Sequence, residues 1–374
     1  MSTDSSPDSL APSQNSSRPF PGVILMYHRI NTIKPDPWTL AVSPINFAAH
    51  LSVLGEMMIP VSLEQFVHEM QKAAAGQFVS ADRQKFLVAI TFDDGYADNF
   101  EFARLLLEDF QIPATIFVTA GRIGDSREFW WDELERIFLQ PNILPANLAI
   151  EINNRKFERT LDDLARYSKA DFERDQNWNC VSTNSVSPQI RHNIYLELFD
   201  LIKPLGDKDQ NKILTQLFRW AQMDGEATTK IDFPVARANR RMMSGHELRQ
   251  VACSELIAIG AHTMTHPVLS TLSVTAQRQE ILASKQILEK IIKCPVKGFA
   301  YPNGFRLDYT AETANAVRAA GFDYACAAFD EPVTTATDLF ELPRVMVRDW
   351  SETVFRENLA QIVSNRSRTS YNHN

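Results

Sequence analysis

The chain has 374 residues, 44% of them hydrophobic, which is enough for one large domain or two ordinary ones with a substantial core. Its 46 acidic and 38 basic residues give a net charge of −8, which argues against a nucleic-acid or membrane-surface binder, because either needs a basic face. No apolar run approaches the ~20 residues that a transmembrane helix needs.

The two ends of the chain have the composition of loose tails. Residues 1–20 are rich in serine and proline and lack the basic and apolar regions of a secretory signal, so we expect a disordered tail there. Residues 366–374 are expected to form a second loose tail. The four cysteines are scattered without a CxxC pair, which indicates buried reduced thiols and, with the lack of a signal, a cytoplasmic protein.

Between the tails, short apolar segments alternate with amphipathic helical patterns. The apolar segments are mostly continuous runs, which is typical of strands in a parallel sheet that is covered on its outer face. Helices are predicted at 97–110, about 275–293 and 310–320. Such alternation predicts an α/β fold with right-handed crossovers, either a barrel or a doubly wound sheet. The predicted strands are residues 23–28, 86–93, 114–120, 256–262, 298–301, 324–328 and 343–347.

This alternation stops between about 130 and 240. The segment is polar, has helical patterns at 194–202 and 213–222, and contains no convincing buried strand. We therefore expect a domain at 21–365 that carries a mainly helical insertion between two strand–helix units.

Two adjacent carboxylates end the strand predicted at 86–93, in the stretch VAITFDDGYADNF. Asp93 and Asp94 repel each other and contribute no packing. One of them could cap the helix that begins near Tyr96, but this role leaves the other carboxylate unexplained. A divalent cation accounts for both, because one aspartate binds it and the other stays ionised in its field.

Two histidines follow the strand predicted at 256–262, in the stretch IGAHTMTHPVLS. On one helical turn, the four-residue spacing of His262 and His266 places both imidazoles on the same side. This spacing is common at transition-metal sites, although surface histidines also show it by chance. With one aspartate, the pair forms a three-ligand set suited to zinc or another first-row metal, and the second aspartate is free to act as a general base.

Together these two stretches resemble the motifs of the NodB-type polysaccharide deacetylases, carbohydrate esterase family 4. Residues 91–95 read T-F-D-D-G, the family's first motif, and residues 262–266 fit its second, H-[ST]-x-x-H. The third motif, usually R-x-P-Y, is altered here to FAYPNG at 299–304. The resemblance covers roughly residues 20–350. It implies a distorted (β/α) barrel, which agrees with the strand–helix alternation.

The resemblance also implies a role for each matching residue. Asp93 corresponds to the general base, and Asp94, His262 and His266 correspond to the ligands of a divalent metal. Zinc is the expected metal, with cobalt and nickel as alternatives. Tyr301 is taken as the counterpart of the tyrosine whose backbone N–H stabilises the oxyanion.

Two parts of the family pattern are missing. The third-motif arginine, which orients the base, aligns with Ala300, and Arg344 in LPRVMV is the candidate replacement. The late leucine–histidine motif, which supplies the general acid, is absent. Because the first and last strands of a closed barrel are neighbours, His28 at the end of the first strand is expected to supply the proton. A subset of the family begins with a similar M-Y-H stretch. The alternative role of His28 is that of a buried, hydrogen-bonded strand-end residue.

An aromatic pair, Trp130 and Trp131, opens the insertion in REFWWDEL. Aromatic faces stack on sugar rings, so Trp131 is a candidate for substrate binding. An equally good interpretation is that the pair anchors the insertion to the barrel. Asp132 is expected to pair either with Arg344 or with the substrate, and Trp38 to anchor a loop.

These features predict a metal-dependent hydrolase that removes an N-acetyl group from an amino sugar in a glycan or glycan precursor and releases acetate. The alternative is a carbohydrate-binding or scaffolding protein that has lost catalysis, which would explain the missing arginine and late histidine. We favour the enzyme, because adjacent charges near a core are costly to keep without a use. No nucleic-acid partner or membrane span is expected, and the lack of a signal favours an intracellular intermediate of glycan or glycolipid synthesis as substrate.

Overall fold

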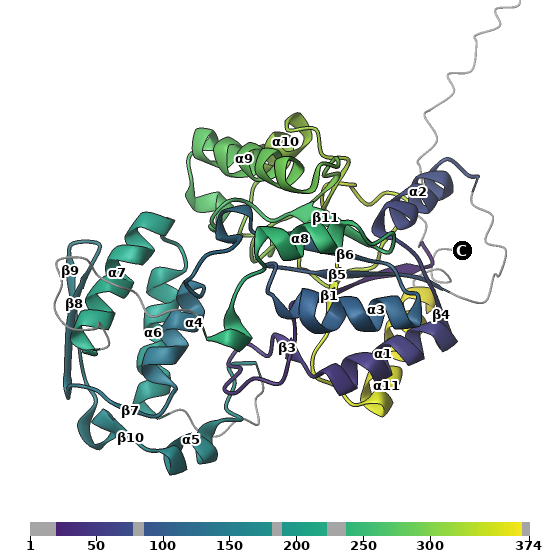
Figure 1. Cartoon of the computed structure of the whole chain (residues 1–374). Coiled ribbons are helices and arrows are strands. Elements are labelled where there is room, and N and C mark those ends of the chain that lie inside the picture. The colour runs from purple at the N-terminus through teal and green to yellow at the C-terminus, as the bar shows by residue number, and fades with distance from the viewer. Residues whose placement is uncertain (1–19, 78–85, 182–188, 223–236, 369–374) are drawn as a thin grey trace, which may run out of the picture.

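The structure is a computed structural model that describes residues 20–77, 86–181, 189–222 and 237–368 (Figure 1). Most of the two predicted tails lies outside these residues. Phe20, assigned to the first tail, is buried, and residues 366–368, assigned to the second, belong to the last helix.

A parallel sheet forms the centre of the molecule. Its hydrogen-bonded order is β13-β12-β11-β6-β5-β1-β14, and β4 pairs with the beginning of β5. The strands are β1 (Gly22–Tyr27), β4 (Met58–Pro60), β5 (Phe86–Phe92), β6 (Ala114–Val118), β11 (Ile257–Ala261), β12 (Gly298–Ala300), β13 (Tyr324–Cys326) and β14 (Val345–Met346). All seven predicted strands are present, and each lies within two residues of its expected bounds. The short β4 was not predicted, because three residues give no recognisable pattern.

The two ends of this sheet approach each other. β1, the first strand, pairs in parallel with β14, the last, where Leu25 lies opposite Val345. The segment that leads into β14 also bonds to β13, since the Leu342 N–H donates to the Ala325 carbonyl (2.9 Å). The sheet is therefore a curled half-barrel, and the predicted distorted (β/α) barrel is confirmed.

Helices cover the outer face of the sheet (Figure 1). They are α1 (Pro44–Met57), α2 (Leu63–Ala74), α3 (Arg104–Phe110), α8 (Gly245–Ala252), α9 (Val274–Ile292), α10 (Ala311–Ala319) and α11 (Glu352–Arg368). Two of the predicted helices are confirmed as α9 and α10, with Ser273 and Thr310 as side-chain N-caps. The helix predicted at 97–110 begins as a π-helical turn, Asn99–Ala103, which leads into α3.

The segment at about 130–240 packs around an apolar core of its own, beside the barrel (Figure 1). The two helices predicted there are confirmed as α6 and α7, but its strands were not predicted. Strands β8 and β9 form an antiparallel hairpin in which β8 alternates exposed and buried residues. The elements are α4 (Trp130–Phe138), β7 (Asn142–Ile143), β8 (Asn147–Ile152), β9 (Arg155–Thr160), β10 (Arg166–Tyr167), α5 (Lys169–Asp175), α6 (Ile190–Ile202) and α7 (Asp207–Trp220). A further short parallel pair, β2 (Arg29–Ile30) and β3 (Ala41–Val42), follows β1.

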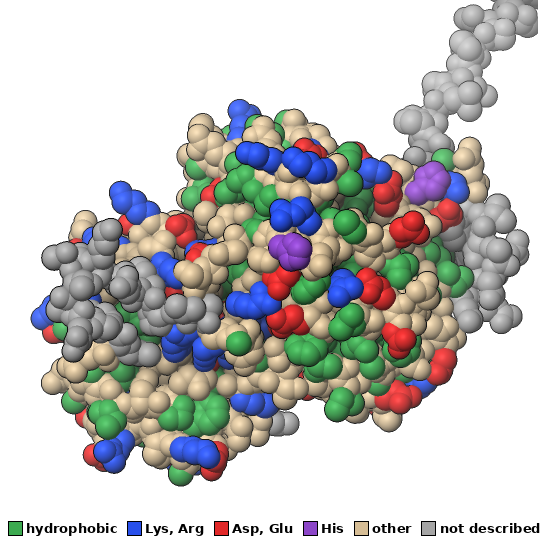
Figure 2. Space-filling model, viewed as in Figure 1, with side chains coloured by type: hydrophobic (Ala, Val, Ile, Leu, Met, Phe, Trp, Pro, Cys, Tyr) green, Lys and Arg blue, Asp and Glu red, His purple; other side chains and the backbone are tan. Residues whose placement is uncertain are grey.

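Surface features agree only in part with the expectations from composition. No helix in the described part of the chain is long and apolar enough to cross a membrane. Basic and acidic side chains are interspersed over the face seen in Figure 2. All four cysteines are free, but Cys253 and Cys294 are exposed, so the prediction of buried thiols is wrong for these two.

Candidate active site

A sharp turn after β5 sends the two adjacent carboxylates in different directions. The backbone N–H of Asp93 donates to the Tyr27 carbonyl of β1 (3.0 Å), which holds Asp93 at the end of the sheet. Asp94 has a left-handed backbone (φ 74°), and so does Gly95 (φ 88°). A Cβ on Gly95 would lie 2.9 Å from Val118 Cγ1, so this turn needs glycine. Neither carboxylate caps the following helix.

Arg344 binds the first of these carboxylates. Its two terminal nitrogens donate to the two oxygens of Asp93, each at 2.7 Å, and its Nε donates to the Ala327 carbonyl (2.9 Å). Although burial opposes ionisation, the Arg344 guanidinium lowers the pKa of Asp93 below its usual value. Arg344, which precedes β14, therefore fixes the orientation of the Asp93 carboxylate.

The second carboxylate lies beside both histidines. Asp94 Oδ1 is 3.6 Å from His262 Nε2 and 3.3 Å from His266 Nε2, and all three ligand atoms lie within 4.8 Å of one another. Metal bonds of about 2.0–2.1 Å at tetrahedral angles separate ligand atoms by roughly 3.4 Å, so this spacing fits a zinc-sized ion. His262 Nδ1 bonds to the Ala300 carbonyl (2.8 Å), which leaves Nε2 for the metal. Burial opposes the charge of Asp94, but the hydrogen bond from His266 lowers its pKa well below the usual range.

The stretch that carries the two histidines is a loop. Thr263 and His266 both have φ 63°, so the helical turn assumed from their spacing is wrong. The Thr263 hydroxyl accepts the His266 N–H (3.0 Å) and donates to the His262 carbonyl (2.6 Å). The imidazoles converge because this threonine closes the loop.

A carboxylate on α9 holds the same loop from outside. Glu280 Oε2 accepts the N–H groups of Met264 and Thr265, both at 2.9 Å, and Oε1 accepts the Thr265 hydroxyl (2.9 Å). These bonds fix the two residues between the histidines. Glu280 has no side-chain contact with the histidines themselves, so it acts through the backbone of the loop.

Glu280→Ala is therefore expected to weaken metal binding by about 10–100-fold, as loss of supporting contacts does at metal sites. Glu280→Gln can still accept both N–H groups and should retain most of the affinity. Glu289→Ala is the matched control, because Glu289 on the same helix accepts the Val296 N–H and pairs with Lys285 (3.0 Å), and neither partner belongs to the histidine loop. Zinc titration of the metal-free proteins measures the effect. An unchanged zinc affinity in Glu280→Ala would show that the loop keeps its conformation without Glu280.

His28 shares a cavity of about 600 Å³ with Asp93, Asp94 and Arg344. The histidine is half-buried, and no described residue hydrogen-bonds to its ring. Burial lowers the pKa of His28, and the two aspartates oppose this effect. The side chain is thus directed to the cavity and is not used as a structural hydrogen-bonding group.

Tyr301 does not take the role predicted for it. Its backbone N–H donates to the Cys326 carbonyl (3.1 Å), its hydroxyl donates to the Phe340 carbonyl (2.8 Å), and its ring stacks on Tyr309. The N–H is therefore not available for an oxyanion. With Pro302 aligned to the proline of R-x-P-Y, the tyrosine position falls on Asn303. Asn303 lines the cavity with φ 58°, and its N–H has no acceptor in the described part of the chain.

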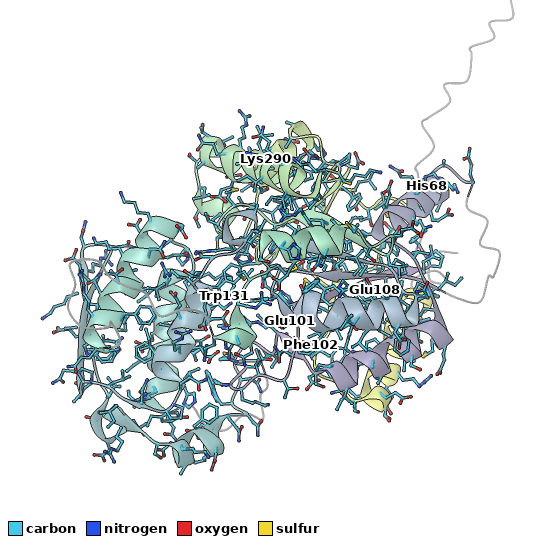
Figure 3. All side chains as sticks on the ribbon, in the orientation of Figure 1. His68, Glu101, Phe102, Glu108, Trp131 and Lys290 are labelled. Carbon is cyan, nitrogen blue, oxygen red and sulfur yellow. The ribbon has the colours of Figure 1, made fainter. Side chains whose placement is uncertain are left out.

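Trp131 lies where the insertion meets the barrel (Figure 3). It lines the cavity and contacts the edge of His266, with ring centroids 5.0 Å apart. Its Nε1 donates to the Tyr96 hydroxyl (3.0 Å), so Trp131 both anchors the insertion and forms a wall of the cavity. Asp132 does not approach Arg344 as expected, because it pairs with two other buried arginines, Arg29 (2.5 Å) and Arg240 (2.9 Å).

Comparison with known proteins agrees with this geometry. The family model described as polysaccharide deacetylase matches residues 80–146 and 226–325, on either side of most of the insertion. No curated protein sequence matches the chain. Among solved structures, the chain is similar to the Streptococcus pyogenes deacetylase PplD in complex with acetate (18% identity, TM-score 0.52), covering 92% of this chain and 99% of that one. It is also similar to IcaB from Ammonifex degensii (16% identity, TM-score 0.52), covering 92% and 97%.

At such identities the solved structures show the fold, and the family model adds the motifs. The matched residues include the aspartate pair, both histidines and Asn303. The chain is therefore similar to the polysaccharide deacetylases of the NodB type, which hydrolyse N-acetyl amide bonds.

Proposed function

We propose that this deacetylase is metal-dependent and removes the N-acetyl group from an amino sugar of a glycan or glycan precursor, releasing acetate. The observation that carries the proposal is the separation of the two aspartates. Asp93 is bound by Arg344, and Asp94 faces the two histidines 3.3 and 3.6 Å away. One carboxylate is thus kept ionised beside a three-ligand metal site.

Asp94, His262 and His266 would hold the metal, which acts as a Lewis acid toward the acetyl carbonyl. One carboxylate and two imidazoles suit zinc, with cobalt and nickel as alternatives. The residues around these three ligands carry out the proton transfers. Asp93, oriented by Arg344, takes a proton from the attacking water.

Two further residues complete the proposed reaction. The Asn303 N–H would donate to the carbonyl oxygen as that oxygen gains negative charge. His28 protonates the departing amine, so that the C–N bond breaks to give acetate and a free amino sugar. Both residues line the same cavity as Asp93.

The alternative function is a carbohydrate-binding protein without catalysis. Two absences favoured it, the third-motif arginine and the late histidine. Arg344 binds Asp93 and His28 lines the cavity, which supports these two residues as replacements for the missing arginine and histidine. The cytoplasmic location stays a prediction from the sequence.

Elemental analysis and an acetate-release screen over N-acetyl sugars test the proposal. We expect about one metal ion per chain, and loss of acetate release after chelation that zinc, cobalt or nickel restores. Acetate release that persists in metal-free protein would contradict metal dependence. Carbohydrate binding without acetate release from any sugar of the screen would support the alternative.

His28→Ala is expected to lower kcat by about 10²–10⁴-fold, the usual contribution of a positioned acid. Metal content should stay unchanged and KM nearly so, because the role is confined to the transition state. His28→Gln, which can hydrogen-bond but not transfer the proton, should be equally slow. A loss below about tenfold in both variants would assign the proton donor elsewhere.

A further inference from the structure

The cavity beyond the catalytic groups has an apolar wall that no step of the proposed reaction uses. Trp38 from the loop after β2, Phe199 from α6 and Trp130 from α4 form a continuous aromatic surface. The Trp38 and Phe199 rings are 4.2 Å apart, and the Trp130 and Phe199 rings 4.9 Å apart. We call these three residues the aromatic wall. It joins the barrel to the insertion, so the insertion itself shapes this side of the cavity.

Two of the three indole nitrogens beside the cavity are already used inside the protein. Trp38 Nε1 donates to the Tyr195 hydroxyl (2.8 Å), as Trp131 Nε1 does to the Tyr96 hydroxyl. These two tryptophans therefore offer ring faces to a ligand but no donor to sugar hydroxyls. A bound oligosaccharide needs many hydrogen-bond partners, because each buried hydroxyl without one is costly.

The apolar character continues to the mouth of the cavity. Phe305 and Val181, which line the same cavity, are 53% and 49% exposed. Large apolar side chains gathered at a pocket mouth are typical of a site that binds an apolar group. A hydrocarbon chain could thus follow one apolar surface from the aromatic wall to solvent.

A half-buried cation, Arg348, lies beside the aromatic wall. Arg348 lines the cavity and donates to the backbone carbonyls of Trp38 (2.6 Å) and Thr39 (3.1 Å). Within the described residues no carboxylate lies in ion-pair distance of it. Burial lowers the pKa of Arg348, and Asp36, which lies beyond ion-pair distance, opposes this effect only in part. An anionic group on the ligand would supply a close counter-charge.

We propose that the substrate is an amphiphile: a single N-acetylated amino sugar joined through an anionic linker to a hydrocarbon chain. The sugar lies over Asp93, the linker lies near Arg348, and the hydrocarbon packs on the aromatic wall. This inference rests on the proposed function, because it requires the acetyl group to reach Asp93. It excludes an internal residue of a long polysaccharide as the preferred substrate.

Calorimetry with methyl, hexyl and dodecyl glycosides of N-acetylglucosamine, below their micelle concentrations, tests the hydrocarbon site. The hexyl glycoside should bind the metal-loaded protein at least tenfold more tightly than the methyl glycoside, because each buried methylene adds affinity. Chitotetraose, the N-acetylglucosamine tetramer, should gain nothing over the methyl glycoside. Equal affinities along the alkyl series, or a tetramer that binds as tightly as the hexyl glycoside, would overturn the proposal.

Substitutions in the cavity test whether the alkyl chain binds at the aromatic wall and the cavity mouth. Phe199→Ala and Phe305→Ala should each remove most of the gain from methyl to hexyl; Phe305 is at the surface, so its loss leaves the core intact. Leu105→Ala is the control, since Leu105 is a 52% exposed apolar residue on α3 outside the cavity. A gain that persists in both phenylalanine variants, or is lost in the control, would show non-specific adsorption and overturn the site.

The anionic linker has a separate test. N-acetylglucosamine 1-phosphate should bind more tightly than the methyl glycoside, and Arg348→Gln should abolish this difference. Arg306→Gln, an exposed arginine paired with Glu331 near the mouth, should leave it unchanged. No preference for the phosphate, or one that survives Arg348→Gln, removes the linker from the proposal.

Measurement of acetate release distinguishes failure of the amphiphile proposal from failure of the proposed function. If the alkyl series shows the gain but no N-acetyl sugar releases acetate, the proposed function fails and the hydrocarbon site stands. If the tetramer and the hexyl glycoside release acetate with equal kcat/KM, the proposed function stands and the amphiphile is wrong.

Discussion

Asp93→Asn is expected to abolish measurable acetate release while the protein still binds one metal ion per chain. The substitution keeps the shape of the side chain but removes the charge that accepts the proton, and a positioned base contributes about 10²–10⁴-fold. Arg344 also loses its counter-charge. Because breaking a buried ion pair costs about 3–5 kcal/mol, the variant should unfold at lower denaturant concentration and must be assayed where it is folded.

Asp94→Asn is the companion variant, and metal titration separates the two aspartates. Asp94 lies beside both histidines, so its change should weaken metal binding itself, whereas Asp93→Asn should bind metal nearly as the unaltered protein does. Identical titrations for the two variants would refute this division of roles. Asp98→Asn is the control: an amide oxygen can still accept the Ile30 N–H and the Asn99 side-chain N–H that Asp98 accepts, so turnover should stay within a few-fold.

The double variant His262→Ala, His266→Ala is expected to lose both bound metal and turnover. Two of three protein ligands are removed, and one carboxylate does not hold a first-row metal at micromolar concentration. The fold should persist, because both histidines lie in a loop after β11 and not within the sheet.

Thermal unfolding provides a readout independent of activity. Added zinc should raise the Tm of the unaltered protein, since a ligand that binds only the folded state stabilises it, and should leave the Tm of the double variant unchanged. His246→Ala, which removes an exposed histidine on α8, should behave as the unaltered protein. Stoichiometric metal retained by the double variant would show that these histidines are not the ligands.

Most of the fold could be predicted because its signals are local. Continuous apolar runs such as residues 86–92 can be recognised without knowing their neighbours, and the parallel sheet follows from their alternation with helices. β8 was missed because its alternating residues pack on the insertion's own core, inside a stretch that is polar on average. The turn at Thr263 was missed because a left-handed threonine leaves no pattern in the sequence.

Some site residues could likewise be predicted from local sequence, and others could not. Asp93, Asp94, His262 and His266 are recognisable from the sequence, because each pair lies within five residues and its spacing carries the chemistry. The tyrosine of the third motif was misplaced, because whether the Tyr301 N–H is free depends on its partner in β13. The proline of the altered motif is the signal that would have indicated Asn303 instead.

The sequence by itself determined the fold class, the adjacent carboxylates and the histidine pair, since short-range patterns encode them. Only the tertiary structure decided that Arg344 binds Asp93 across 251 positions, that Asp132 pairs with Arg29 and Arg240, and that Trp38 meets Phe199. Such pairs form where the closing of the barrel and the packing of the insertion bring distant segments together. Sequence spacing cannot predict these contacts, because the sheet order and the packing of whole elements determine them.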